Sequence, residues 1–420
     1  MDAATHGSGE IYYPRLLLPS IQTALLDTRV VCVLGPRRCG KTTLVRRLDP
    51  NRPYIDLDDS EYYRVAREDP AGFVASLPDT ATLDEVQRVP ALLSAIKVAV
   101  DRDRRPGRFV LAGSANLVLA RQATDSLAGR IETVLLQPLT EAEKERREGA
   151  FLSALLANGL RPSIQAGSVS AIEGLPRRLV AGGFPEPVPR NPSRARQWHR
   201  QYSASIIERD VRDMAEVRMA GRLKRFVEML AVRTATLVNT SNIASDIGLS
   251  RDTVNHYLEV LERLFVIRRL PAWHSNEWRR LVKSPKLHFV DTGLAAALAR
   301  RSTSDWLARR TEMGRLLESF VVQQVIAQSA WTDPDLQFWH YRDKDKVEVD
   351  LVVTRGASTW GIEVKSSASV SSSDGQGLAR LAARCGDNFE SGVILYAGSS
   401  LLPTRDPRVL AVPLSELWNR

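Results

Sequence analysis

Residues 29–48 read Arg-Val-Val-Cys-Val-Leu-Gly-Pro-Arg-Arg-Cys-Gly-Lys-Thr-Thr-Leu-Val-Arg-Arg-Leu, and this stretch decides the fold. Its first six residues form a short run rich in β-branched side chains, and residues 30–34 are all apolar, as in a buried strand. A glycine-rich loop, Gly35–Thr42, follows directly, and residues 43–48 have the pattern of a helix. This order of strand, loop and helix predicts an α/β fold whose parallel strands end at a ligand.

The loop has the spacing Gly-x-x-x-x-Gly-Lys-Thr, which is typical of a phosphate-binding loop. Its backbone N–H groups, unobstructed at Gly35 and Gly40, and the helix N-terminus are expected to hold phosphates. Lys41 is expected to reach the β- and γ-phosphates, and the Thr42 hydroxyl to bind Mg²⁺. A chance glycine-rich turn would lack these flanking elements. The loop therefore predicts ATP and Mg²⁺ as ligands, with contacts from Gly35, Pro36, Arg37, Arg38, Cys39, Gly40, Lys41, Thr42 and Thr43.

A second acidic motif, Leu83-Asp84-Glu85, follows an intervening strand at residues 54–57. Asp84 is expected to hold Mg²⁺ through water, and Glu85 to activate the attacking water, so that Glu85 and Lys41 are the main catalytic candidates. Residues 80–83 are less apolar than a buried central strand usually is. A surface acidic pair is therefore the alternative.

Further polar residues follow the next strands. Ser114 and Asn116 end the run that begins at Arg108, where either can sense the γ-phosphate or cap the following helix. Arg130 precedes a strand at residues 132–136 and is a catalytic candidate for a γ-phosphate contact within or between subunits. An ordinary surface arginine is the alternative at that position.

Together these motifs resemble those of a known family, the prokaryotic AAA-type ATPases with a C-terminal domain of unknown function. The resemblance runs from about Leu17 to the C-terminus and rests on Gly35-Pro-Arg-Arg-x-Gly-Lys-Thr42, Leu83-Asp-Glu-Val-Gln87, Ala112-Gly-Ser114, Leu127-Ala-Gly-Arg130 and Gly182-Gly-Phe-Pro-Glu186. It implies an ATPase core, a winged helix and a nuclease-like module. ATPases of this type usually build their sites at subunit interfaces, so a homo-oligomer is expected.

We therefore expect four parts along the chain. They are a P-loop AAA-type ATPase core at 1–140, a helical lid at 141–220, a winged helix-turn-helix at 221–290 and an α/β restriction-endonuclease-like domain at 291–420. Arg209-Asp210, in a long helical pattern of the second part, resembles a family motif or forms an ordinary surface ion pair.

Residues 237–270 show a helix-turn-helix pattern with a tight turn at Gly248. The second helix is expected to direct Arg251, Asn255 and His256 outward, where a recognition helix meets base edges. Residues 266–270 and 283–289 are expected to form a winged hairpin. Winged helices also bind proteins, and the acidic far end of the helix would repel phosphates.

The C-terminal part contains two predicted strands, 347–353 and 361–366. If they pair as a hairpin, Asp350 and Glu363 lie together, with Lys365 on the same face as Glu363. Two such carboxylates can bind Mg²⁺, Lys365 can orient or deprotonate water, and Glu318 can complete the shell. This resembles the D-x(n)-E-x-K pattern of restriction endonucleases. The alternative is an ordinary cross-strand ion pair.

The composition favours a polyanionic partner. The 420-residue chain has a formal net charge of +9 and an isoelectric point near 9.6, which makes DNA the expected partner. Three cysteines without paired spacing argue against a disulfide framework or a zinc site. The polar N-terminus and the lack of a long apolar run predict a cytoplasmic protein without a membrane partner.

The leading hypothesis from the sequence is a Mg²⁺-dependent ATPase that couples ATP binding and hydrolysis to DNA binding or remodelling. One alternative is a nucleotide-gated regulator or scaffold, of toxin-antitoxin or defence type, whose nuclease-like module only binds. Another is a DNA nuclease licensed by ATP.

Overall fold

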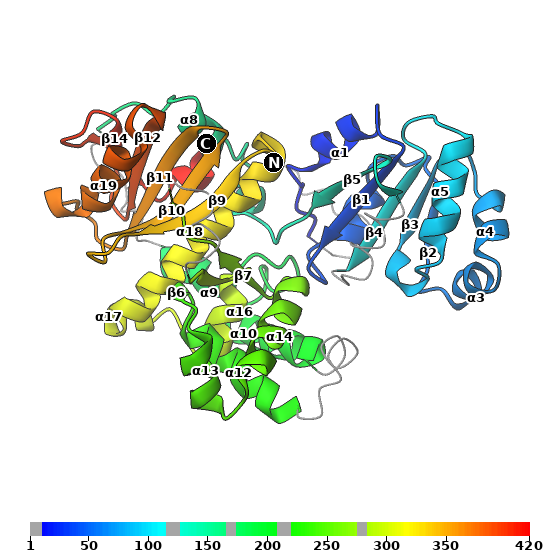
Figure 1. Cartoon of the computed structure of the whole chain (residues 1–420), viewed down its shortest axis with the longest axis horizontal. Helices are drawn as coiled ribbons and strands as arrows, with labels where there is room; N and C mark the ends of the chain where they lie inside the picture. Colours follow the sequence, from blue (N-terminus) through cyan, green and yellow to red (C-terminus); the bar gives the residue numbers. More distant parts are fainter. Residues whose placement is uncertain (1–10, 115–126, 165–173, 208–219, 275–283) are drawn as a thin grey trace. The chain divides into compact units, whose positions relative to one another are not determined.

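The computed structural model describes residues 11–114, 127–164, 174–207, 220–274 and 284–420. The chain divides into two compact units, one formed by Arg15–Pro138 with Arg263–Val266 and the other by the remaining residues (Figure 1). Cys32, Cys39 and Cys385 are free thiols. Within the described ranges, no helix is both long enough and apolar enough to cross a membrane.

The first unit is built on a five-stranded sheet with the order β2-β3-β4-β1-β5. All neighbouring strands are parallel, so their carboxyl ends meet at one edge. The central strand β1 is buried along its whole length, as its run of β-branched residues predicts. The strands are β1 (Val30–Gly35), β2 (Tyr54–Asp56), β3 (Ala81–Asp84), β4 (Phe109–Ser114) and β5 (Ile131–Leu135).

Three helices, α3, α4 and α5, cover one face of this sheet. Val30, Cys32 and Leu34 alternate along β1 and join one core with Phe73 of α4 and Ile96 of α5. The alternation follows from the two-residue period of a strand. The helical segments of this unit are α1 (Leu18–Ala24), α2 (Lys41–Val45), α3 (Ser60–Glu68), α4 (Pro70–Ser76), the 3₁₀ turn η1 (Val86–Arg88) and α5 (Leu92–Arg102).

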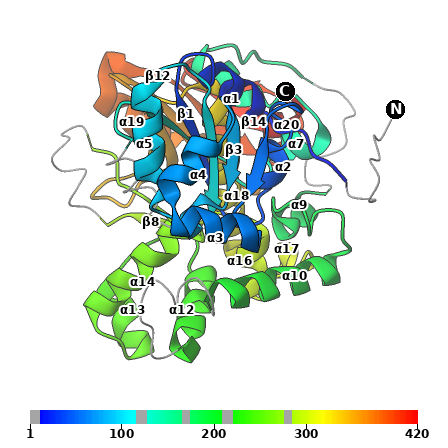
Figure 2. The ribbon, with the colours of Figure 1, turned by 90° about the vertical axis from the view of Figure 1, so that its right-hand side faces the viewer.

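The second unit contains a helical group in which α16 packs against α9, α10 and α12, and Figure 2 shows α10 as a long helix beside α16. The rings of Phe184, Trp198 and Tyr202 contact one another; Trp198 and Tyr202 are stacked, and Phe184 is tilted against both. The helices are α7 (Glu141–Glu145), α8 (Phe151–Leu156), α9 (Leu175–Ala181), α10 (Pro192–Ser205), α12 (Ala220–Val232), α16 (Thr292–Leu298) and α17 (Asp305–Ala308).

Two further helices, α13 (Thr240–Ile247) and α14 (Arg251–Arg263), are joined by a turn at Gly248, whose φ of 66° favours glycine. The Ser250 hydroxyl accepts a hydrogen bond from the Thr253 N–H and so caps α14. A small antiparallel sheet accompanies these helices in the order β6-β8-β7. Its strands are β6 (Thr236–Leu237), β7 (Ile267–Leu270) and β8 (Lys286–Phe289).

The C-terminal part is a mixed six-stranded sheet with the order β13-β14-β12-β11-β10-β9. Leu378 and Leu381 of α19 pack with Val349, Val352 and Ile394 on one face, and the long helix α18 contacts β11. The elements are α18 (Arg310–Thr332), β9 (Gln337–Arg342), β10 (Glu348–Arg355), β11 (Ser358–Lys365), η3 (Ser372–Gly375), α19 (Gln376–Cys385), η4 (Gly386–Asn388), β12 (Phe389–Tyr396), β13 (Leu402–Pro403), β14 (Val409–Pro413) and α20 (Glu416–Asn419).

Candidate functional site

The glycine-rich loop lies between β1 and α2 at the carboxyl edge of the first sheet. A Cβ atom added at Gly35 would lie 2.2 Å from the carbonyl oxygen of Leu136, so only glycine fits there. Gly40 has a φ of 101° and precedes α2, where the chain must turn in a left-handed conformation. The loop is thus shaped by close packing and turn geometry.

Lys41 begins α2, and its side chain folds back over the loop. Its ammonium donates hydrogen bonds to the carbonyl oxygens of Gly35, at 3.1 Å, and Pro36, at 2.8 Å. The residue is only 6% exposed. Because both acceptors are neutral carbonyls, the positive charge remains uncompensated by them and attracts a phosphate.

A hydrogen-bonded set next to the loop supplies the oxygen atoms that Mg²⁺ prefers. The Thr42 hydroxyl donates to Asp84 Oδ2 at 2.6 Å, and the Tyr54 hydroxyl donates to the same oxygen at 2.7 Å. Asp84 is 1% exposed at the end of β3. The predicted metal residues Thr42 and Asp84 therefore lie together, and Tyr54 is a further member of the set.

Glu85 follows Asp84 in a left-handed conformation, with a φ of 54°. Burial raises the pKa of its carboxyl, and the charge of Asp84 adds to this, while the Gln87 hydrogen bond and Lys41 lower it. The Gln87 amide donates to the Glu85 carboxylate. A carboxylate with a raised pKa beside the loop suits a general base, and Gln87 holds it in place.

Arg15 braces the loop from outside the motif. Its guanidinium donates to the carbonyl oxygens of Cys39, at 2.8 Å, and Gln137, at 2.7 Å. These bonds join the loop to the chain leaving β5, although 122 residues separate Arg15 from Gln137. The sequence offered no signal for Arg15, because it precedes every motif of the loop.

Two predicted site residues, Ser114 and Arg130, lie at opposite edges of the sheet. Ser114 pairs with Gly35 in register and therefore lies beside the loop. Arg130 precedes β5, its carbonyl oxygen accepts from the Val30 N–H, and its side chain is paired with Asp101. Since Val30 begins β1, the structure does not bring Arg130 to the loop of the same chain. Asn116 lies outside the described residues.

The predicted recognition helix is α14. Arg251 and His256 are exposed on it, and Asn255 is partly exposed, as expected for residues directed outward. The Val254 and Leu258 side chains are buried on its other face. Arg209 and Asp210 lie outside the described residues.

The C-terminal strands β10 and β11 pair as the expected antiparallel hairpin, with Leu351 opposite Ile362. Asp350 Oδ2 accepts from the Val364 N–H at 2.9 Å, and Glu363 Oε1 accepts from Lys365 at 2.8 Å. The predicted residues Asp350, Glu363 and Lys365 are therefore neighbours.

Lys286 of β8, which the sequence analysis missed, lies beside two residues of the expected metal shell. Its ammonium lies 2.7 Å from Glu318 Oε1, 3.3 Å from Glu348 Oε2 and 3.5 Å from Asp350 Oδ1. A cation of this chain thus contacts Glu318 and Asp350, which were expected to ligate Mg²⁺, and also contacts Glu348. Across the described ranges, no group of three or more His, Cys, Asp or Glu side chains is arranged to hold a metal ion.

Burial dominates the electrostatics of this cluster. It raises the pKa of Glu318 well above its ordinary value, and repulsion from Asp350 adds to this. Burial and Asp350 likewise raise the pKa of Glu363 to about 8, against the lowering effect of Lys365. The side chain of Lys286 is only 5% exposed, yet its pKa is raised because the surrounding carboxylates outweigh its desolvation.

The parallel sheet, the loop after β1 and the Thr42–Asp84 pair define a P-loop nucleotide-binding domain of the ATPase class. Family models agree with this class. A model described as an AAA domain matches residues 27–144. Two models described as domains of unknown function, DUF8612 and DUF4143, match residues 172–305 and 313–417.

Two curated mycobacterial proteins are similar along most of the chain. "Uncharacterized protein Rv2008c" of Mycobacterium tuberculosis and "Uncharacterized protein Mb2031c" of Mycobacterium bovis are each 31% identical over 400 residues, covering 94% of this chain and 82% of theirs. The chain therefore belongs to the family of these proteins, as an AAA-type ATPase with additional C-terminal domains of unknown function.

Solved structures include similar chains of lower identity. The Walker-type ATPase PABY2304 of Pyrococcus abyssi is 16% identical, with a TM-score of 0.43 over 71% of this chain and 99% of that chain. The RuvB Holliday junction branch migration motor of Thermotoga maritima is also 16% identical, with a TM-score of 0.29 over 62% of this chain and 90% of that chain.

Proposed function

We propose that this protein is a cytoplasmic, Mg²⁺-dependent ATPase that couples ATP binding and hydrolysis to DNA binding or remodelling. The observation that carries the ATPase part is the 2.6 Å contact between Thr42 and Asp84 beside a loop that only glycine can form at Gly35. This arrangement fits a nucleotide with a divalent cation, because it combines phosphate donors with hard oxygen ligands.

Each residue then has a defined task. Lys41 exchanges its neutral carbonyl partners for β- and γ-phosphate oxygens. Thr42 and Asp84 hold Mg²⁺, which supplies charge compensation at the phosphates. Glu85 accepts a proton from the attacking water, and its raised pKa brings it closer to the working pH. Tyr54 orients Asp84 by donating to the oxygen that Thr42 also contacts.

The DNA part of the proposal rests on the order of elements in residues 220–289. A helix, a short strand, two helices and two antiparallel strands follow each other, and the sheet order is β6-β8-β7. We interpret this as a winged helix in which α14 reads DNA through Arg251, Asn255 and His256. The wing residues 275–283 lie outside the described residues.

The C-terminal sheet fits the expected restriction-endonuclease-like arrangement, because Asp350, Glu363 and Lys365 meet on adjoining strands. Lys286 distinguishes between two functions for this sheet, cutting DNA and only binding it. A buried ammonium among Glu318, Glu348 and Asp350 supplies the compensation that a metal would otherwise provide. We therefore favour a module that binds without cutting over an ATP-licensed nuclease.

A homo-oligomer is part of the proposal. Arg130 lies at the sheet edge away from its own loop, so it can contact a γ-phosphate only in a neighbouring subunit. Such a contact would replace the present ion pair with Asp101.

The proposal is tested by measuring ATP hydrolysis by the full chain with and without single-stranded, duplex and branched DNA. Glu85→Gln should retain nucleotide binding and lose at least about 100-fold in hydrolysis, since a positioned general base contributes roughly that much. Lys41→Ala should lose both, and Arg67→Ala, an exposed cation of the same unit, serves as the matched control. Hydrolysis that no DNA stimulates would contradict the coupling, and hydrolysis unchanged in Glu85→Gln would contradict the assigned base.

A further inference from the structure

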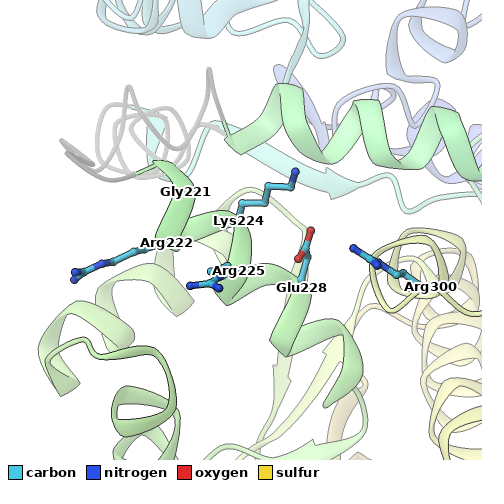
Figure 3. A pocket seen from close by; sticks show the side chains of 6 residues that line it. All are labelled: Gly221, Arg222, Lys224, Arg225, Glu228 and Arg300. Carbon is cyan, nitrogen blue, oxygen red and sulfur yellow. The ribbon is translucent and has the colours of Figure 1, made fainter.

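A basic pocket lies in the helical group of the second unit. It has a volume of about 620 Å³ and is lined by Gly221, Arg222, Lys224, Arg225 and Glu228 of α12 and by Arg300, which follows α16. Figure 3 shows Lys224, Glu228 and Arg300 directed into a common space. Four of these six residues are cationic and one is acidic, which leaves an excess of three positive charges.

Among the described residues, no salt bridge neutralises Lys224, Arg225 or Arg300. The neighbouring cations Arg233 and Arg301, in contrast, are paired with Asp246 and Glu312. Arg222, Lys224, Arg225 and Arg300 are all exposed. Ion pairing is common elsewhere in this chain, so an uncompensated group of this size marks a surface suited to an anion.

The pocket continues toward α10. An adjoining cavity of about 500 Å³ shares Gly221, Lys224, Glu228 and Arg300 and is lined further by Arg200 and by the apolar residues Ala204, Ile207, Ala297 and Leu298. Phosphate contacts from such a cationic surface fix the position of a nucleic acid and do not depend on its base sequence. Arg200 is exposed and extends the positive surface along α10.

This surface is connected to the predicted recognition helix. Arg222 donates through Nη1 to the carbonyl oxygen of Gly248, at 3.5 Å, in the turn between α13 and α14. In helix-turn-helix proteins, phosphate contacts from neighbouring helices position the recognition helix, whereas base contacts specify the sequence. Arg222 thus lies where such positioning contacts are needed, and Lys224 follows it two residues later on α12.

We infer that this pocket binds the phosphate backbone of DNA, with Lys224 and Arg300 as the principal contacts, and so positions α14 independently of base sequence. The inference rests on the proposed DNA-binding function and names a surface for it. An acidic protein segment is the competing partner, and the experiment below separates the two.

The test compares Lys224→Gln/Arg300→Gln with Lys344→Gln/Arg405→Gln in the full chain. The control removes two exposed cations from the C-terminal part and so has the same net charge. Affinity for duplexes of several unrelated sequences, and for polyglutamate as an acidic polypeptide, is measured between 50 and 200 mM salt. Loss of two phosphate contacts should reduce the slope of log affinity against log salt by ~1.8 and weaken binding roughly tenfold for every sequence. A thermal melt of each variant checks the fold, which exposed substitutions should leave intact.

Three results would overturn either the inference or the proposed DNA-binding function on which it rests. If the wild type binds no DNA, the proposed function itself fails. If the wild type binds and the pocket variant retains the affinity and slope of the control, only the pocket assignment fails. If the pocket variant loses binding to polyglutamate but keeps DNA binding, the surface serves an acidic protein and the inference is wrong.

Discussion

Replacing Lys286 with methionine tests whether its ammonium takes the place of a metal ion among Glu318, Glu348 and Asp350. The attraction between its ammonium and Glu318 at 2.7 Å corresponds to about 6 kcal/mol at an effective dielectric constant of 20, before desolvation is subtracted. Removing one partner of a buried pair usually costs about 3–5 kcal/mol net, because the remaining charge stays buried. For a unit of this size we expect the melting temperature to fall by roughly 10 °C.

The variant should then acquire a metal site that the wild type lacks. With the ammonium gone, Glu318, Glu348 and Asp350 offer oxygen ligands to Mn²⁺. Saturation at about 100 times the dissociation constant would restore roughly 2.7 kcal/mol of stability. The assay is thermal melting of the nucleotide-free chain with and without Mn²⁺, beside titration calorimetry.

Two further variants make the result decisive. Lys286→Met/Asp350→Asn should lose the Mn²⁺ rescue, because a ligand is missing. Lys344→Met, an exposed lysine near the same sheet, should melt like the wild type under both conditions. The reasoning is refuted if Mn²⁺ stabilises the wild type as strongly as Lys286→Met and Asp350→Asn alone abolishes that effect.

Two other predictions concern Arg15 and Glu363. Arg15→Met should destabilise the first unit by about 2 kcal/mol and weaken nucleotide binding, because two charge-assisted hydrogen bonds to Cys39 and Gln137 are lost. Urea denaturation measures the stability, and titration with a fluorescent nucleotide measures the affinity. An unchanged affinity would show that Arg15 does not shape the loop. Because burial and Asp350 raise the pKa of Glu363 to about 8, the folded state binds its proton more tightly than the unfolded state, so this group's contribution to stability falls as pH rises from about 4.5 to 8. Glu363→Gln should therefore gain stability relative to the wild type between pH 5 and 8, by at most about 1.4 kcal/mol per pH unit. Urea denaturation gives the free energy of unfolding of both proteins at each pH, and parallel pH profiles would contradict the raised pKa of Glu363.

Local patterns predicted the parts of this protein that are built from contiguous residues. The AAA-type ATPase domain is confirmed by the match over residues 27–144. The strands expected at 347–353 and 361–366 appear as β10, Glu348–Arg355, and β11, Ser358–Lys365. In each case the signal lies in alternation or in fixed spacing along one segment, which short-range physics determines.

Residues that reach their partners only through tertiary contacts were not predicted from the sequence. Tyr54 contacts Asp84 only because β2 lies beside β3 in the sheet. Lys286 reaches Glu318 and Asp350 from a strand of another sheet. A lysine in the run 286–289 has no distinguishing local pattern, and its role depends on three carboxylates that are 32, 62 and 64 positions away. Such placements require the assembled fold.

The contrast between Lys41 and Lys286 indicates which part of the chain performs chemistry. Both residues are nearly inaccessible, at 6% and 4% exposure, so burial does not distinguish them. Lys41 donates to neutral carbonyl oxygens, which a phosphate can replace with a gain in electrostatic energy. Lys286 already contacts three carboxylates, so any exchange of partners would leave buried negative charge uncompensated. The first lysine is therefore arranged to meet a substrate, whereas the second completes a structure, which supports ATP hydrolysis at the P-loop and binding without cutting at the C-terminal sheet.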